Sequence, residues 1–566
     1  MTNRTLTILD ITGIQNYIFG SNRLRENIGA SFLVEQATSQ WLHDALSDYK
    51  HNLSENGQEV KDPTDTDTNA DKLQAEVVYR GGGNIVILFD TLEQAQTSVS
   101  NLNKIMLVEA PGLEIAAAHI EFDWDTRAVG GIDGVYNELL NKLAEQKQVR
   151  RPSTPLLGQS VTLGCHATGL PAVAFAAVGA ARDEKKPLQI VPVSAEIDAK
   201  VNGDTGDKAD DRLRHFLGLE RRKDYRLSLH LDELGRSHGE SSYIALVHAD
   251  GNNMGVRFKK LVDQYDKQGQ NGECIVAIRE LSRSVETASR TALQATVESL
   301  IKTLDALPED KPLKKSISIP EDKRDKAYKY YLPFRPLVFG GDDVTFVCDG
   351  RLGLSLAATY LTAFEQATTN LPGGPAYACA GVAIVKAHYP FARAYALCEE
   401  LCRNAKQMAK DVKEKHDKDA SAMDWHFALS GPIGSIAGIR ERSDVSQNGQ
   451  DKRTLWMRPI TLKKSKLSSW RHWDTLHDVL IEFNIPKWQE RRNKLLQLQE
   501  KLRKGPGETE YFRKAFSLPC LPKPKDISED QSKTGWIQED ESMLRCVYFD
   551  AIEALDFYTP IHSREE

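Results

Sequence analysis

Long hydrophobic runs are missing from this chain of 566 residues. No stretch approaches the roughly 18 to 20 consecutive apolar residues that a membrane-spanning helix needs. The N-terminus enters a strand-like pattern at residues 6–9 without a basic leader. We therefore expect a cytoplasmic protein that makes no membrane contact.

Cysteine is also scarce, with 8 scattered residues. Cys398 and Cys402 lie inside a helical pattern, which favours buried thiols in a reducing compartment over a disulfide framework. Cys165-His166 precedes no second cysteine pair that would complete four zinc ligands, so we do not expect zinc.

The chain carries no net positive charge; its formal net charge is -7. Any nucleic-acid contact must therefore come from local basic patches. The candidates are Arg150-Arg151, Arg221-Arg222-Lys223 and the run 491–504, although most such runs are solvated faces.

What the chain has is the length for two to four domains and the composition of an ordinary globular protein. Its first part predicts strands at 6–11, 75–79, 85–89 and 114–122, helices at 23–46 and 92–107, and a solvated loop at 50–70. Gly81-Gly82-Gly83 permit the tight hairpin turn between the second and third strands. This β-α-β-β-α-β order is ferredoxin-like.

The same order returns after Ser241. Strands are predicted at 243–249, 335–339, 344–348 and 376–387, and helices at 273–304, 352–369 and 390–410, with a charged loop at 305–329. A connector begins with Pro152 and Pro155, and apolar residues at helical spacing over 470–515 predict a C-terminal helical module.

The predicted fold class is therefore α+β, with two tandem ferredoxin-like units of the kind called palms in polymerases. The predicted domains are a first palm at 1–150, a connector at 151–240, a second palm at 241–458 and a helical C-terminal domain at 459–566.

The second unit carries a candidate catalytic site. Asp250 ends its first strand, and Gly340-Gly341-Asp342-Asp343 form the hairpin tip that the strand order places beside it. Carboxylates from two neighbouring strands can hold two divalent ions, Mg²⁺ or Mn²⁺, that serve a nucleoside triphosphate. Glycine before aspartate is also a common surface turn, but the partner carboxylate of Asp250 favours catalysis.

These residues resemble a known family, the large polymerase/cyclase subunit of type III CRISPR effector complexes, called the Cas ten type. The resemblance covers about two-thirds of the chain, and the stretches that carry it are 10–15 with 29–31, 81–84, 250–255, 340–343, and 380–383 continuing through 389–390 to 405–406, with Arg458-Pro459 in addition. It implies condensation of ATP into cyclic oligoadenylates with release of pyrophosphate, in antiviral defence. It also implies CRISPR effector subunits and guide or target RNA as partners.

The resemblance also implies residue roles. Asp250, Asp342 and Asp343 would be catalytic metal ligands, with the carbonyl of Gly251 as a further ligand. The residues expected to bind the nucleotide are Gly251, Asn252, Asn253, Gly340, Gly341 and Lys406, the last at the triphosphate.

Three departures from the family pattern stand out. Asn252 replaces a frequent aspartate, and Gly83-Asn84 replace the carboxylate pair in the first unit, which we expect to have a structural or second-nucleotide role without a metal. We also expect the family's nuclease domain to be missing, because His43-Asp44 and His477-Asp478 lie in helical patterns without further ligands.

Two alternatives to this oligonucleotide cyclase stay open. One is a catalytically silent scaffold subunit of an RNA-guided complex, which the intact carboxylates disfavour. The other is a GGDEF-like synthase of a cyclic dinucleotide, which the two units in one chain disfavour. A free-standing relative of the family also fits the length.

Overall fold

The computed structural model describes residues 3–57, 59–61, 73–149, 161–178, 189–202, 207–234, 242–319, 328–416, 418–428, 434–443, 445–447, 451–465, 469–540 and 543–561. Arg150, Arg151, Pro152 and Pro155 lie outside the described residues, as do parts of the two predicted loops. The class is α+β, as predicted.

The first sheet has four strands in the order β2-β3-β1-β4, all antiparallel. Its strands are β1(Asn3–Thr12), β2(Ala75–Gly81), β3(Asn84–Phe89) and β4(Glu114–Asp123). Side chains alternate along β1, so that Leu9 and Ile11 face one helical layer whereas Leu6 and Ile8 face another. This is the ferredoxin-like order that the sequence predicts.

Helices cover both faces of the first sheet. The layer over Leu9 and Ile11 contains α2(Leu24–Thr38), α3(Gln40–Ala45) and α5(Leu92–Glu109), and the opposite layer contains α6(Val135–Val149). A short helix, α1(Ile14–Phe19), follows β1 directly. The helix predicted at 23–46 is interrupted at Ser39, whose φ of -124° and ψ of -93° are not helical.

The second sheet has six strands in the order β10-β11-β8-β12-β13-β16. They are β8(Tyr243–Gly251), β10(Phe334–Gly340), β11(Asp343–Asp349), β12(Ala378–Lys386), β13(Ala422–Ala428) and β16(Ile460–Thr461). The first four repeat the order of the first sheet, and β13 adds a strand parallel to β12. The two β hairpins also share an irregularity at the same distance from their tips, between Val77 and Tyr79 and between Pro336 and Val338.

The helices of this unit again form two layers. On one face, Ala245 and Val247 pack against α10(Asn271–Ala306) and α12(Gly353–Ala367). On the other face, Ile244 and Leu246 pack against α13(Phe391–His416). The shorter helices α9(Met254–Val262), α11(Pro312–Ile317) and α14(Ile436–Ser443) lie between these elements in the chain.

The connector consists of β5(Ala174–Val178), β6(Gln189–Val193), α7(Ala195–Asn202), α8(Asp207–Phe216) and β7(Tyr225–Leu227). Strand β7 pairs in parallel with β9(Tyr330–Leu332) of the second unit. Helix α7 packs on α2 at Gly29, where a Cβ would lie 1.8 Å from the carbonyl oxygen of Lys200. Only glycine allows this approach of the two helices.

The C-terminal part contains a sheet that the sequence patterning did not predict. Its helices are α15(Trp473–Phe483), α16(Pro486–Gln489), α17(Arg492–Leu502), α18(Pro506–Ala515), α19(Glu529–Thr534) and α20(Phe549–Ala554). Its sheet has the order β14-β15-β18-β17 and consists of β14(Val445–Gln447), β15(Asp451–Thr454), β17(Trp536–Asp540) and β18(Met543–Cys546). These strands are too short to give a clear alternation, and two of them precede residue 459. The domain boundaries themselves stay predictions.

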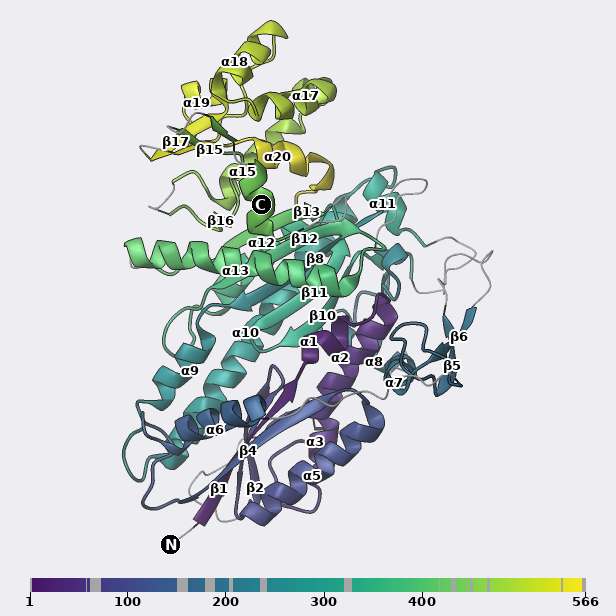
Figure 1. Cartoon of the computed structure of the whole chain (residues 1–566), viewed down its shortest axis with the longest axis vertical. Helices are drawn as coiled ribbons and strands as arrows, with labels where there is room; N and C mark the ends of the chain where they lie inside the picture. Colours follow the sequence, from purple (N-terminus) through teal and green to yellow (C-terminus); the bar gives the residue numbers. More distant parts are fainter. Residues whose placement is uncertain are drawn as a thin grey trace.

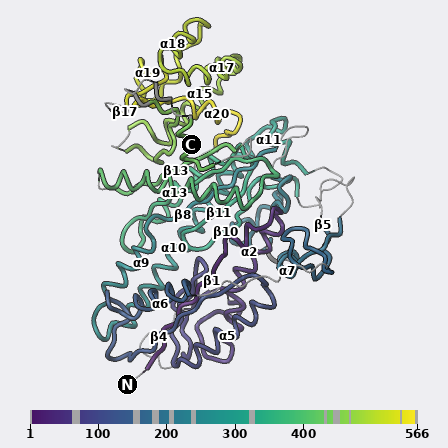
Figure 2. Tube along the Cα trace, viewed as in Figure 1, coloured from purple at the N-terminus to yellow at the C-terminus, as the bar shows by residue number. Residues whose placement is uncertain are grey.

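The units follow one another along the long axis of the molecule. Figure 1 shows the first sheet at the N-terminal end, the second sheet in the middle and the C-terminal helices at the other end, and the trace in Figure 2 follows the same course. The connector lies beside the junction of the two sheets. All eight cysteines lie in the described ranges, are free, and except for Cys520 are buried. Within those ranges, no helix has both the length and the apolar character to cross a bilayer.

Candidate nucleotide and metal site

Three aspartates meet where the central strands of the second sheet end. Asp250 on β8 lies opposite Asp343 on β11 in the antiparallel register. Asp342 lies beside Gly251, the next residue of β8. The Gly251 N–H donates to the Asp342 carbonyl at 3.2 Å. A Cβ at Gly251 would lie 2.8 Å from the Cβ of Asp342, so this position requires glycine.

The hairpin turn explains why a charged side chain can occupy its tip. Gly340 and Gly341 have positive φ values of 143° and 73°, whereas Asp342 does not have a positive φ. In the first unit both turn residues, Gly82 and Gly83, have positive φ values of 56° and 84°. A side chain is therefore strained at Gly83 but accommodated at the equivalent Asp342.

Lys406 reaches the same strand end from α13. Its ammonium Nζ lies 2.5 Å from Oδ2 of Asp250. Burial lowers the pKa of Lys406, but the negative charge and hydrogen bond of Asp250 outweigh it and leave the pKa above its usual value. Helix α13 can approach β12 closely because residue 381 is glycine, where a Cβ would lie 2.1 Å from the Cys398 carbonyl oxygen.

Asp342 has an altered protonation equilibrium. Burial and the neighbouring charge of Asp250 raise its pKa from 3.8 to about 7. Among the residues that the structure describes, no three His, Cys, Asp or Glu side chains form a ready-made metal cage. The carboxylates of Asp250, Asp342 and Asp343 nevertheless suit a hard cation, because Mg²⁺ commonly uses one or two carboxylates and retains waters. The donor set therefore fits a divalent ion.

His248 is a neighbour of the site that the sequence reasoning missed. Its Nδ1 lies 3.2 Å from Oδ1 of Asp343 and 3.1 Å from Oγ1 of Thr345. Burial lowers the pKa of His248, yet the contact with Asp343 and the charge of Asp250 raise it above its usual value. The signal was present, because period-2 alternation puts residues 248 and 250 on one face of β8.

Asn252 and Asn253 shape the turn after β8. The Asn252 N–H donates to the Tyr377 carbonyl at 2.7 Å, and its side-chain amide donates to the Ala420 carbonyl at 3.2 Å. Asn253 has a φ of 57° and precedes the first residue of α9. Both residues thus hold the backbone beside Asp250, and their predicted contact with nucleotide stays a prediction.

A cleft of about 2220 Å³ lies between the two units. Its lining includes the tips of both hairpins, among them Asp342 and Asp343, but neither Asp250 nor Lys406. The tips approach each other closely, since a Cβ at Gly341 would lie 3.8 Å from the backbone nitrogen of Gly82. The cleft therefore adjoins the acidic strand ends and the glycine hairpin of the first unit.

The first unit retains part of the same arrangement. Asp10 of β1 lies opposite Asn84 of β3, as Asp250 lies opposite Asp343. Lys147 of α6 lies with its Nζ 2.7 Å from Oδ2 of Asp10, which parallels the pair of Lys406 and Asp250. The sequence reasoning missed Lys147, because it did not compare the helices that follow the last strand of each unit.

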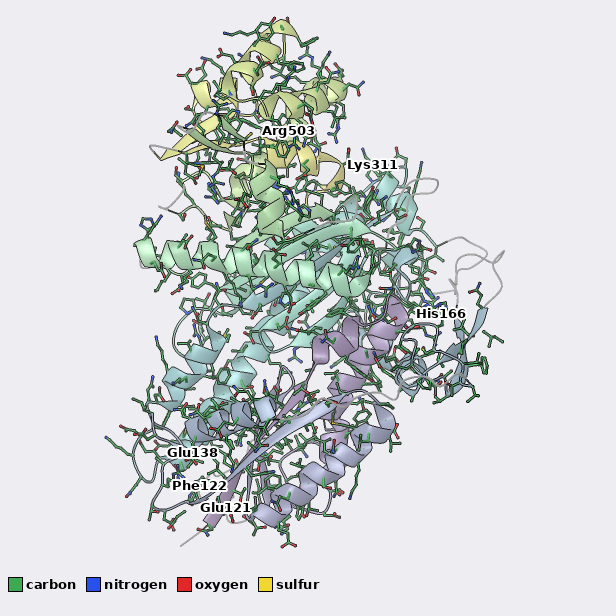
Figure 3. The ribbon with its side chains drawn as sticks, viewed as in Figure 1. Glu121, Phe122, Glu138, His166, Lys311 and Arg503 are labelled. Carbon is green, nitrogen blue, oxygen red and sulfur yellow. The ribbon has the colours of Figure 1, made fainter. Side chains whose placement is uncertain are left out.

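The remaining sequence candidates lie elsewhere. His43 and Asp44 are neighbours on α3, and His477 on α15 hydrogen-bonds the hydroxyl of Tyr558. Cys165 is buried in the connector. Its neighbour in the sequence, His166, is labelled in Figure 3. Burial raises the pKa of the Cys165 thiol, but hydrogen bonds with Thr168 and Ser194 bring it down to about 7.

The described basic runs are largely engaged within the chain. Arg222 pairs with Asp305 at 3.4 Å, and Arg492 pairs with Asp556. Arg503, labelled in Figure 3, lies 4.6 Å from the ring of Phe549. These contacts are those of solvated and packing side chains and do not indicate a nucleic-acid site.

One segment of the chain matches a known family model. Residues 243–419 match the family described as Cas10/Cmr2, second palm domain. No curated protein matches the sequence.

Solved structures of Csm1–Csm4 cassettes have a similar fold. The cassette in complex with cA4 is 13% identical, with a TM-score of 0.51 over 98% of this chain and 70% of that chain. The cassette with cA3 is 13% identical, with a TM-score of 0.50 over 99% and 70% of the two chains. The cassette with AMPPNP is 14% identical, with a TM-score of 0.50 over 98% and 69%. At such identity the likeness shows the fold alone.

Proposed function

We propose that this chain, whose residues 243–419 match the Cas10/Cmr2 second palm domain, is a Cas10-like, metal-dependent nucleotidyltransferase. It condenses ATP, or another nucleoside triphosphate, into a cyclic or linear oligonucleotide and releases pyrophosphate. The observation that carries this proposal is the meeting of Asp250, Asp342 and Asp343 at adjoining strand ends beside the cleft. Such convergence is what a palm-type centre needs.

The residues that would hold two ions, Mg²⁺ or Mn²⁺, are Asp250, Asp342 and Asp343, with the carbonyl of Gly251. When bound, the ions neutralise the triphosphate and make the attacking hydroxyl a better nucleophile. The raised pKa of Asp342 supports this assignment, because a cation beside it would favour the ionised carboxylate. Gly340 and Gly341 let the backbone approach the phosphates.

Lys406 has the position to change partners. Its ammonium is paired with Asp250. A triphosphate that extends from the cleft past Asp342 to the end of β8 would offer it phosphate oxygens, and Asp250 would then be free to hold an ion. Lysine suits this role because its compact charge needs no bidentate geometry.

The cleft is large enough for two nucleotides. Its volume of about 2220 Å³ exceeds the roughly 300 to 1,000 Å³ of a usual small-molecule site. In the first unit, which we take as a degenerate palm, Asp10 and Lys147 keep the ion pair but Gly83 and Asn84 provide no carboxylates. A second nucleotide, held through Lys147 without a metal, fits this arrangement.

The oligonucleotide would be a second messenger in antiviral defence. The neighbouring structures are Csm1–Csm4 cassettes, two of them with cA4 or cA3. We therefore propose cyclic oligoadenylate as the product class, and CRISPR effector subunits with guide or target RNA as partners. A silent scaffold subunit and a GGDEF-like dinucleotide synthase are the alternatives.

Incubation of the purified chain with each nucleoside triphosphate and Mg²⁺, followed by mass spectrometry, tests the proposal. The test is made with and without effector subunits and target RNA. We expect oligoadenylate and pyrophosphate from the wild type and from Asn84→Ala, and no product from the double variant Asp342→Ala with Asp343→Ala. Product from the double variant would exclude this site. A wild type inactive under all conditions would favour the scaffold.

A further inference from the structure

We propose that His248 is a positioning residue that fixes the carboxylate of Asp343, and that Phe19 of the first unit keeps His248 in place through Tyr395. The proposal rests on the proposed function, because it concerns how one of the proposed metal ligands is oriented. It adds a role for the first unit that involves neither metal nor nucleotide.

His248 holds one oxygen of Asp343 from within the core. The residue is 5% exposed, and its Nδ1 faces both Oδ1 of Asp343 and Oγ1 of Thr345 at 3.2 Å and 3.1 Å. Nδ1 hydrogen-bonds Thr345, whereas Oδ1 of Asp343 lies within ion-pair distance of the same nitrogen and has no hydrogen-bond partner among the described residues. His248 therefore contacts the carboxylate on its Oδ1 side. Groups that hold a metal ligand in this way commonly change metal affinity about 10- to 100-fold when removed.

Tyr395 on α13 packs against the imidazole of His248. The two rings make an edge contact, with centroids 5.4 Å apart and an interplanar angle of 67°. The Tyr395 hydroxyl is buried and has no hydrogen-bond partner among the described residues. Ring packing, and not a hydrogen bond, therefore sets the position of Tyr395.

Phe19 provides that packing from the first unit. Its ring stacks on Tyr395 with centroids 4.2 Å apart and an interplanar angle of 16°. Close by, the Phe391 N–H at the start of α13 donates to Oδ1 of Asn22 at 3.0 Å. The end of α1 thus contacts the helix that also carries Lys406. A continuous line of contacts runs from Phe19 through Tyr395 and His248 to Asp343.

The test measures binding of Mn²⁺ alone to the full chain by electron paramagnetic resonance, without nucleotide. The variant His248→Leu has an apolar side chain of moderate size and lacks the ring nitrogen Nδ1. The variant His248→Asn has a side-chain N–H donor near the position of Nδ1. We expect His248→Leu to weaken Mn²⁺ binding about 10- to 100-fold and His248→Asn to restore it to within about threefold.

His426→Leu is the matched control. His426 lies on β13 of the same sheet. Burial, and to a smaller extent the charges of Arg458 and Arg440, lower the pKa of His426 to about 3, so its side chain is neutral. We expect this variant to bind Mn²⁺ like the wild type. Equal weakening by His426→Leu and His248→Leu would mean a general loss of packing and would overturn the proposal.

Phe19→Ala tests the link to the first unit. We expect it to weaken Mn²⁺ binding about threefold to tenfold, and to add little when combined with His248→Leu, because two residues in one line of contacts are not additive. Full additivity would overturn the role of Phe19.

The outcomes separate the two proposals. If the wild type binds Mn²⁺ and His248→Leu binds it equally well, the positioning role is wrong and the proposed function stands. If His248→Asn is as weak as His248→Leu, the nitrogen is not what matters, and the positioning role is again wrong. If the wild type does not bind Mn²⁺, both proposals fail.

Discussion

At the residue scale, the protonation of Asp342 makes the stability of the folded protein depend on pH. Its pKa of about 7 in the folded protein exceeds the ordinary 3.8, so between these values the folded chain holds a proton that the unfolded chain has released. Stability of the metal-free protein must then fall as pH rises through this window. We predict that Asp342→Asn removes this loss and melts at a higher temperature than the wild type at pH 8.

Thermal melts in a chelator at pH 5 and pH 8 check this prediction. The wild type should lose more stability between the two values than Asp342→Asn does, and Mg²⁺ should restore stability only to the wild type. Parallel changes in the two proteins would contradict the raised pKa.

Lys406 is the second residue whose role can be measured directly. Lys406→Ala should raise the KM for the nucleotide about tenfold, or about 1.4 kcal/mol, because the charge facing the triphosphate is lost. Lys406→Arg should recover part of the affinity. Steady-state kinetics give the result, and Lys410→Ala is the control, since Lys410 lies on the same helix and is exposed. Equal KM values for the two alanine variants would remove Lys406 from the site.

Some residues of the site could be predicted from sequence and others could not. The positions of Asp250, Asp342 and Asp343 follow from the ferredoxin-like strand order and the glycine hairpin, both of which the sequence pattern predicts. His248 shares a face of β8 with Asp250, and Lys147 lies on the helix that follows the last strand of its unit, but neither position by itself identifies a functional partner. A buried histidine in an apolar strand, or a lysine on an exposed helix, has the same local pattern with or without a functional partner.

At the scale of elements, the approach of α13 to β12 determines where Lys406 lies. A Cβ at Gly381 would be 2.1 Å from a backbone oxygen and 2.6 Å from a backbone nitrogen of α13, neither of which can rotate away. We predict that Gly381→Ala costs about 1 to 3 kcal/mol of unfolding free energy. It should also raise the KM for the nucleotide, because the helix moves outward.

Denaturant titration and kinetics measure the two effects together. Gly507→Ala is the matched control, because a Cβ at that helical glycine meets nothing within 4 Å. It should be neutral or stabilising by up to about 1 kcal/mol. If Gly381→Ala behaves like Gly507→Ala, the packing of α13 does not position Lys406.

Periodicity predicted the long elements well and the short ones poorly. The helix predicted at 273–304 is α10, which spans Asn271–Ala306. By contrast, the break at Ser39 and the strands β17 and β18 were not predicted. A strand of four or five residues shows too few alternations to be distinguished from a loop, and tertiary packing decides it.

At the scale of the whole molecule, the two units hold each other through α10. Near its start, Arg279 lies 2.6 Å from Glu76 of β2, and both side chains are buried. Asn271 donates to the carbonyls of Trp124 and Arg127 at 2.9 Å and 3.0 Å. The cleft between the units therefore depends on polar contacts that the sequence pattern did not reveal, because they join residues about 150 to 200 positions apart.

We predict that Arg279→Ala lowers the unfolding free energy by about 3 to 5 kcal/mol, because it leaves the charge of Glu76 buried without its partner. Arg222→Ala, which removes an exposed pair with Asp305, should cost no more than about 1 kcal/mol. The double replacement of Arg279 and Glu76 by leucine should be milder than Arg279→Ala. Equal effects of the two arginine variants in denaturant titrations would show that the buried pair does not hold the units together.

Anomalous scattering can locate the metal ions in the proposed active centre. Crystals grown with Mn²⁺ and a non-hydrolysable ATP analogue give anomalous density at the ions. We expect two Mn²⁺ peaks within ligand distance of Asp250, Asp342 and Asp343, the triphosphate beside Gly340 and Gly341, and no peak at Asn84. Mn²⁺ and triphosphate bound elsewhere, or a peak at Asn84 with none at Asp342, would contradict it.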